Sequence, residues 1–219
     1  MNKYDVTIGI PVYNIEKYIV RMMESLMSQT YDNIEFLVLD DCGTDGSIDI
    51  IRNYQKNHPR GKDIHIVRQP VNMGLGNGRN RLIDEAQGEY IYFLDGDDAI
   101  APNTIELLIE NAKMYEADIV YGSYKQIFTD DEGRETKIIN HQYEFGTYLG
   151  DDKFAEFVYR KYDGIQANTW NFIIKLSIYK DNKLRYLPIN YWEDFTMTMD
   201  LPSYISKAVL LPDITYFYY

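Results

Sequence analysis

The sequence predicts an α/β fold with a mostly parallel sheet flanked by helices. Short apolar segments rich in β-branched residues alternate, along the first half, with segments whose apolar residues recur at helical spacing. Strands separated by helices of this length are typical of βαβ crossovers, which build parallel sheets. Ligands of such sheets bind at the carboxyl ends of the strands, so the residues that follow each strand are candidates for a site.

The first half contains five expected strands and four expected helices. We expect the strands at residues 6–12, 34–39, 64–67, 90–94 and 117–121. We expect the helices near residues 15–27, 48–54, 77–86 and 102–112. The segment 34–39 is almost entirely apolar, as is typical of a strand covered by helices on both faces.

The second half is less regular. We expect two strands around a turn at residues 130–133, a helix at 151–160, an apolar segment at 168–174 and a last strand near the end. No Gly/Ser-rich or Pro-rich linker interrupts the chain, so residues 1–219 are expected to form one domain. In it, residues 123–219 would complete a site begun by residues 1–122.

Composition excludes several classes of protein. The chain has 22 Lys+Arg against 34 Asp+Glu, and this net charge of −12 argues against binding nucleic acid. No apolar run approaches the roughly 20 residues of a membrane span, and the N-terminus is unlike a signal peptide. The single cysteine, Cys42, fits a reducing cytoplasm. We therefore expect a cytoplasmic protein without a transmembrane segment, with peripheral contact at the inner face of the membrane left open.

The strongest candidate site is Asp95-Gly96-Asp97-Asp98, directly after the strand at 90–94. Three carboxylates within four residues repel one another, and a hard divalent cation such as Mg²⁺ or Mn²⁺ would offset that repulsion. The alternative is a solvated acidic turn that caps the next helix. The position at the end of a strand favours the metal.

Two further groups follow the first two strands. Asp40 and Asp41 could accept hydrogen bonds from a base or a ribose, although a capped turn would use the same residues. Tyr13 could stack on an aromatic ring of a ligand, and the alternative is an ordinary strand-to-helix turn.

Two more groups lie later in the chain. The Gly-rich segment 72–80 opens a helix and contains Arg79, which could bind an anion or merely neutralise aspartates. Glu193 and Asp194 follow Trp192, where a carboxylate could act as a general base or simply favour a helix N-terminus.

Taken together, these groups resemble the family 2 glycosyltransferases. The matching segments are IPVYN with Glu16, SQTYDNIEFLVLDDCGTDGS, NMGLGNGRN, GEYIYFLDGDDAIAP and the late WED, in the family's order. The resemblance covers residues 5–115 strongly and the rest more thinly. It implies the GT-A fold, a Rossmann-like, mostly parallel sheet with a smaller mixed acceptor-side region.

The resemblance also implies inverting transfer of a sugar from a nucleoside diphosphate sugar, UDP-sugar by expectation, to an acceptor hydroxyl. Pro11, Tyr13 and Asp41 would line the pocket of the nucleotide base. Glu16 would lie at the edge of that pocket, near the ribose. Arg79 would lie near the base or the diphosphate.

The remaining roles concern the reacting centre. Asp95 would contact the ribose, Asp97 would hold Mn²⁺ or Mg²⁺ with Asp98 supporting it, and Asp194 would be the catalytic base. The acceptor would be a saccharide or lipid-linked saccharide of bacterial surface polysaccharide synthesis. Because the family often continues past the last strand, we expect the sequence to be truncated at Tyr219.

Two other classes remain open from the residues alone. One is a nucleotide-sugar-binding relative without turnover. The other is a nucleotidyltransferase, which also uses carboxylates and Mg²⁺ but generally needs a basic Gly-rich loop near its N-terminus.

Overall fold

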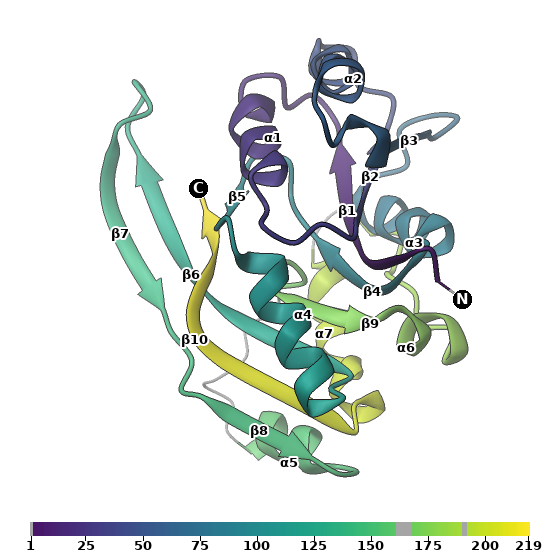
Figure 1. Cartoon of the computed structure of the whole chain (residues 1–219), viewed down its shortest axis with the longest axis vertical. Helices are drawn as coiled ribbons and strands as arrows, with labels where there is room; N and C mark the ends of the chain where they lie inside the picture. Colours follow the sequence, from purple (N-terminus) through teal and green to yellow (C-terminus); the bar gives the residue numbers. More distant parts are fainter. Residues whose placement is uncertain (1, 161–167, 190–191) are drawn as a thin grey trace.

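The computed structural model describes residues 2–160, 168–189 and 192–219, which form a curled sheet flanked by helices (Figure 1). Four strands from the first half are parallel: β1 (Tyr4–Val12), β2 (Ile34–Asp40), β3 (Ile64–Arg68) and β4 (Gly88–Phe93). Within this group β1 lies between β2 and β4, and β3 pairs with the outer side of β2. The parallel arrangement expected for the first half is therefore present here.

Beyond β4 the sheet is mixed. Its order continues through β9 (Phe172–Lys175), β6 (Ile119–Thr129), β10 (Lys207–Tyr218) and β5 (Ala99–Ile100). Strand β9 is antiparallel to both β4 and β6 and lies between them. From the sequence, β4 and β6 correspond to two consecutive expected strands. The antiparallel strands β7 (Glu135–His141) and β8 (Gly146–Leu149) pair with β6 and β10.

Helices cover both faces of the sheet. The helices are α1 (Ile19–Met27), α2 (Ser47–Asn57), α3 (Leu75–Glu85), α4 (Thr104–Tyr115), α5 (Lys153–Arg160), α6 (Leu176–Asp181) and α7 (Glu193–Asp200). Two 3₁₀ turns add Gly61–Asp63 and Leu201–Tyr204. No helix in the described part of the chain is long and apolar enough to cross a membrane.

Alternating residues of the strands fill two cores. On one face, Ile8 of β1 and Phe36 of β2 pack with α1 and α4. On the other face, Leu37 of β2 and Phe93 of β4 pack with α3, α6 and α7. This double burial explains why β2 is apolar along almost its whole length and buried at every position.

Helix α1 shows how the pattern gives the packing. Its buried residues are Ile19, Met22, Met23 and Leu26, which share one helical face at i, i+3, i+4 and i+7. Burying such side chains contributes about 1.5–3 kcal/mol each. The helix is thereby held against the sheet, next to the loop that follows β1.

Candidate active site

A cavity of about 430 Å³ opens where β1, β2 and β4 end. Because these strands are parallel, the loops that follow them meet at one edge of the sheet. The cavity is lined by Pro11, Val12, Tyr13, Ile15, Leu39, Asp41, Asn72, Gly74, Leu75, Gly78, Asp95, Gly96 and Asp97. Five of the residues expected from the sequence to bind a ligand or metal thus line one cavity, namely Pro11, Tyr13, Asp41, Asp95 and Asp97.

The side of the cavity near β1 and β2 combines an aromatic ring with a carboxylate. Tyr13 is 49% exposed, which leaves its ring available to a ligand. Asp41 is buried, and its two oxygens accept hydrogen bonds from the backbone N–H groups of Met73 (2.9 Å) and Gly74 (3.1 Å). Burial raises the pKa of Asp41, although these two N–H groups oppose the rise. Asp41 therefore also fixes the loop that precedes α3 over the cavity.

The acidic turn, residues Asp95–Asp98, forms another part of the cavity wall. Asp98 N donates to Asp95 O at 3.2 Å, which closes the turn. Gly96 lies so close to Ile15 that a Cβ there would fall 2.1 Å from Ile15 Cδ1. Asp95 and Asp97 line the cavity, and burial and then the Asp95 charge raise the pKa of Asp97.

Asp98 points away from the cavity, into the protein. It is 1% exposed and accepts hydrogen bonds from Tyr216 Oη (2.6 Å) and Tyr219 N (2.9 Å). Burial raises its pKa to about 8, even though both donors favour the ionised carboxylate. Of the two aspartates expected at the metal, only Asp97 lines the cavity, and Asp98 lies behind it.

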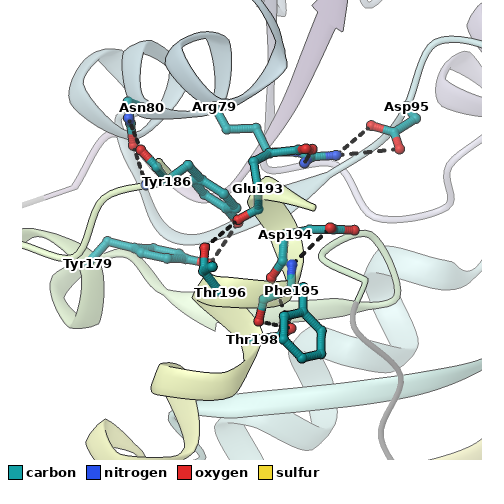
Figure 2. Close-up of polar contacts among 10 residues, drawn as sticks. All are labelled: Arg79, Asn80, Asp95, Tyr179, Tyr186, Glu193, Asp194, Phe195, Thr196 and Thr198. Carbon is teal, nitrogen blue, oxygen red and sulfur yellow. Dashed lines mark hydrogen bonds and ion pairs between the residues drawn. The ribbon is translucent and has the colours of Figure 1, made fainter. Parts of the chain in front are cut away.

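Arg79 is buried between two elements rather than exposed to the cavity. Its Nη1 lies 2.7 Å from Glu193 Oε1, and its Nη2 lies 3.1 Å from Asp95 Oδ1. Burial lowers the pKa of Arg79, but the nearby carboxylates, Asp95 first, raise it by more, so the guanidinium stays charged. Arg79 thus joins the end of β4 to the start of α7 (Figure 2).

Asp194 follows Glu193, the residue that pairs with Arg79. It lies in the first turn of α7, and its Oδ1 accepts a hydrogen bond from Phe195 N at 2.8 Å. Burial raises the pKa of Asp194, and the positive charge of Arg79 opposes the rise. Trp192, which precedes the helix, has a positive φ of 66°, a conformation that bulky residues rarely adopt. Asp194 is not a lining residue of the cavity, but Arg79 and Glu193 connect its helix to Asp95.

The sequence of the chain is similar to that of known proteins. The family model described as glycosyl transferase family 2 matches residues 7–182. The chain belongs to glycosyl transferase family 2. An uncharacterized glycosyltransferase of Haemophilus influenzae is 34% identical over 212 residues, covering 96% of this chain and 76% of the relative. The E. coli chondroitin synthase is 31% identical over 167 residues, covering 76% of this chain and 23% of the synthase.

The chain is shorter than several of these family members. It spans 50% of the length of EpsH of Bacillus subtilis, to which it is 33% identical over 182 residues. S. aureus TarS 1–349, solved in complex with UDP, has the same fold, with a TM-score of 0.80 and 23% identity. That match covers 97% of this chain and 60% of TarS 1–349. The expected GT-A fold is therefore confirmed.

Glu16 and Cys42 also lie outside the cavity lining of this family 2 chain. Glu16 Oε2 accepts a hydrogen bond from Gly46 N (2.7 Å), and Glu16 N donates to Asp45 Oδ2 (2.8 Å). Glu16 therefore joins the loop after β1 to the start of α2. Cys42 has a positive φ of 62°, and its Sγ lies 3.0 Å from Gln69 O.

The sequence reasoning missed Arg21 and Tyr216. An Nη of Arg21 donates to the backbone oxygen of Asp97, and Tyr216 Oη contacts Asp98. No pattern in the sequence indicates Arg21, because it occupies a polar position of α1, where a charged residue is ordinary. Tyr216 lies 118 residues from Asp98 in an aromatic strand, where nothing distinguishes it from its neighbours.

The acidic residues fit a metal that is shared with a ligand. No group of three or more His, Cys, Asp or Glu side chains arranged for a metal occurs among the residues that the structure describes. Mg²⁺ and Mn²⁺ bind through one or two carboxylates plus phosphate and water oxygens, and Asp95 and Asp97 supply such carboxylates at the cavity. The donor set fits a hard divalent cation and does not fit a protein-caged zinc ion.

Proposed function

We propose that the chain is an inverting, metal-dependent glycosyltransferase that uses a nucleoside diphosphate sugar, with UDP-sugar as the expected donor. The observation that carries the proposal is the cavity lined by Tyr13, Asp41, Asp95 and Asp97 at the carboxyl edge of a parallel sheet. Relatives support it by analogy. TarS was solved with UDP and with UDP-GlcNAc, and the mannosyltransferase PcManGT from Pyrobaculum calidifontis with GDP-Man and Mn²⁺.

The donor nucleotide would occupy the cavity. Tyr13 would stack on the base, next to Pro11, and Asp41 would accept a hydrogen bond from it. Asp95 would accept from the ribose while Arg79 holds its carboxylate in place. Asp97 would hold Mn²⁺ or Mg²⁺, which, when bound, would stabilise the negative charge that develops on the diphosphate.

Asp194 would act as the general base. One of its oxygens would take the proton of the acceptor hydroxyl while the acceptor oxygen bonds to the anomeric carbon from the face opposite the diphosphate. The bond from that carbon to the diphosphate oxygen breaks at the same time, and the nucleoside diphosphate leaves with its electron pair. Burial raises the pKa of Asp194 and makes it a stronger base, and general base catalysis contributes about 10²- to 10⁴-fold.

The acceptor would be a saccharide or a lipid-linked saccharide of a bacterial surface polysaccharide. This part of the proposal rests on the relatives, such as the chondroitin synthase of E. coli. The proposal includes a cytoplasmic protein, which would work at the inner face of the membrane when the acceptor carries a lipid.

Calorimetric titration with UDP tests the donor side. We expect binding that strengthens when Mn²⁺ replaces EDTA and a loss of that gain in Asp97→Asn. Asp131→Asn, which makes the same charge change at an exposed residue of the β6–β7 turn, should behave like the parent chain. Equal UDP affinity with and without Mn²⁺ in the parent chain would contradict the proposal.

A donor screen tests turnover and separates the alternatives. Nucleotide release is measured with several nucleoside diphosphate sugars and saccharide acceptors. Asp194→Asn should lose about 10²- to 10⁴-fold in rate, whereas Asp200→Asn, at the exposed end of the same helix, should lose little. Tight UDP binding without release, unchanged by Asp194→Asn, would indicate a binding protein without turnover.

A further inference from the structure

We propose that Tyr216 is a positioning residue for the acidic turn. Its hydroxyl, together with Tyr219 and Arg21, holds Asp95–Asp98 in the conformation that would bind metal and diphosphate. We call Arg21, Tyr216 and Tyr219 the turn clamp. The role given to these contacts rests on the proposed function, whereas the contacts themselves are independent of it.

The first part of the clamp holds Asp98. Tyr216 Oη donates to Asp98 Oδ2 at 2.6 Å, and Tyr219 N donates to Asp98 Oδ1 at 2.9 Å. Both carboxylate oxygens are thereby fixed by the last strand, β10, and the residue that follows it. Asp98 is buried, so neither bond competes with bulk water.

The second part holds the two residues that line the cavity. Tyr216 Oη also accepts a hydrogen bond from Asp95 N at 3.4 Å. Arg21 donates to the backbone oxygen of Asp97, and its guanidinium lies 3.5 Å from the centre of the Tyr219 ring. The clamp therefore reaches the backbone on both sides of Gly96.

Tyr216 is itself held rigidly. Its side chain is fully buried, and its ring stacks on Trp170 with centroids 4.2 Å apart and planes 19° apart. Its backbone pairs with Ile100 of β5, which follows the turn directly. The neighbouring Thr215 O accepts a hydrogen bond from Ala101 N. A rigid strand thus braces the turn from behind, away from the cavity.

The turn has a physical need for such bracing. Asp95 and Asp97 place two carboxylates within three residues, and their mutual repulsion favours an open loop. The proposed contacts of Asp97 with the metal and of Asp95 with the ribose would both weaken if the turn opened. Tyr216 is buried and does not line the cavity, so it would position Asp95 and Asp97 without touching the substrate.

Tyr216→Phe tests the clamp, because it removes one hydroxyl and keeps the ring on Trp170. Tyr218→Phe is the matched control, since Tyr218 lies on the same strand and also stacks on Trp170, with centroids 5.4 Å apart. The first readout is amide hydrogen exchange of residues 94–98 without metal. The second is the affinity for UDP in Mn²⁺ and in EDTA, measured by calorimetry.

We expect faster exchange of residues 94–98 in Tyr216→Phe and parent-like exchange in Tyr218→Phe. We also expect Mn²⁺-dependent UDP affinity to fall about tenfold in Tyr216→Phe, with affinity in EDTA changing less than about twofold. A role in stability alone would weaken both affinities together. Arg21→Met provides the same two readouts from a partly exposed side chain, should Tyr216→Phe fold poorly.

Unchanged exchange in both Tyr216→Phe and Arg21→Met would overturn the inference. The inference would also be overturned if Mn²⁺ strengthened UDP binding as much in Tyr216→Phe and Arg21→Met as in the parent chain, while Asp97→Asn abolished this gain. If Mn²⁺ has no effect on the parent chain, the proposed function fails, and the exchange experiment still decides whether the clamp holds the turn.

Discussion

Removal of the buried Arg79 guanidinium should destabilise the protein severely. Arg79 is 1% exposed and pairs with Glu193 (2.7 Å), which is 5% exposed, and with the partly buried Asp95 (3.1 Å). In Arg79→Met, Glu193 would remain buried without a partner. Removing one member of a buried ion pair costs about 3–5 kcal/mol. For a chain of this size, the unfolding temperature should fall by about 6–20 °C.

The same helix offers a matched control. Arg81 pairs with Glu85 at 2.6 Å, but both side chains are partly exposed to solvent, so Arg81→Met should cost less than about 1 kcal/mol. Thermal unfolding at pH 7, followed by circular dichroism, measures both variants.

A double variant separates charge burial from packing. Adding Glu193→Gln to Arg79→Met removes the unpaired charge, so it should recover part of the lost unfolding temperature. Equal unfolding temperatures for Arg79→Met and Arg81→Met would show that the buried ion pair does not stabilise the protein as expected. So would a double variant that is less stable than Arg79→Met.

Three further variants follow from the geometry. Burial raises the pKa of Asp194 above its ordinary value of 3.8, so the free energy of unfolding falls as the pH rises and this group ionises. Asp194→Asn should therefore lose transfer but should not have a lower unfolding temperature than the parent chain at pH 8. A lower unfolding temperature of the variant would contradict this. Gly76→Ala places a Cβ 2.3 Å from the backbone oxygen of Leu187 and should lower the free energy of unfolding, measured by chemical denaturation, by about 1–3 kcal/mol. Gly78→Ala should cost less, because its Cβ would meet only side chains. Asp41→Asn weakens the two N–H contacts of the loop before α3 and should lower UDP affinity about tenfold by calorimetry, with parent-like affinity as the contradicting result.

Local patterns in the sequence predicted most of the parallel half of the fold. The strand at 34–39 corresponds to β2, because an apolar run in this position must be covered on both faces. The exception within it is instructive. Glu35 is fully buried and is satisfied by Thr7 Oγ1 (2.6 Å) and His65 Nδ1 (2.8 Å), which lie on neighbouring strands. Such a partnership depends on strand register, which the sequence does not reveal.

Non-local pairing explains what the sequence did not predict. The segment at 117–121 overlaps the start of β6, but β9, which comes later in the chain, lies between β6 and β4. The pattern of apolar residues is the same whichever strand is the neighbour, so the mixed order could not be read from it.

The grouping of candidate residues at one cavity could be predicted where those residues follow strands directly. Tyr13, Asp41, Asp95 and Asp97 meet because parallel strands place their carboxyl ends together. The partners of Arg79 could not be predicted in the same way, because Glu193 lies 114 residues away and reaches Arg79 through α7.

A crystal structure of the chain with UDP and Mn²⁺, with anomalous data that locate manganese, shows whether Asp97 holds the metal against the diphosphate. We expect one manganese peak between the Asp97 carboxylate and the diphosphate oxygens, with the uracil beside Tyr13 and Asp41. A nucleotide bound elsewhere, or a bound diphosphate with no manganese at Asp97, would contradict this expectation.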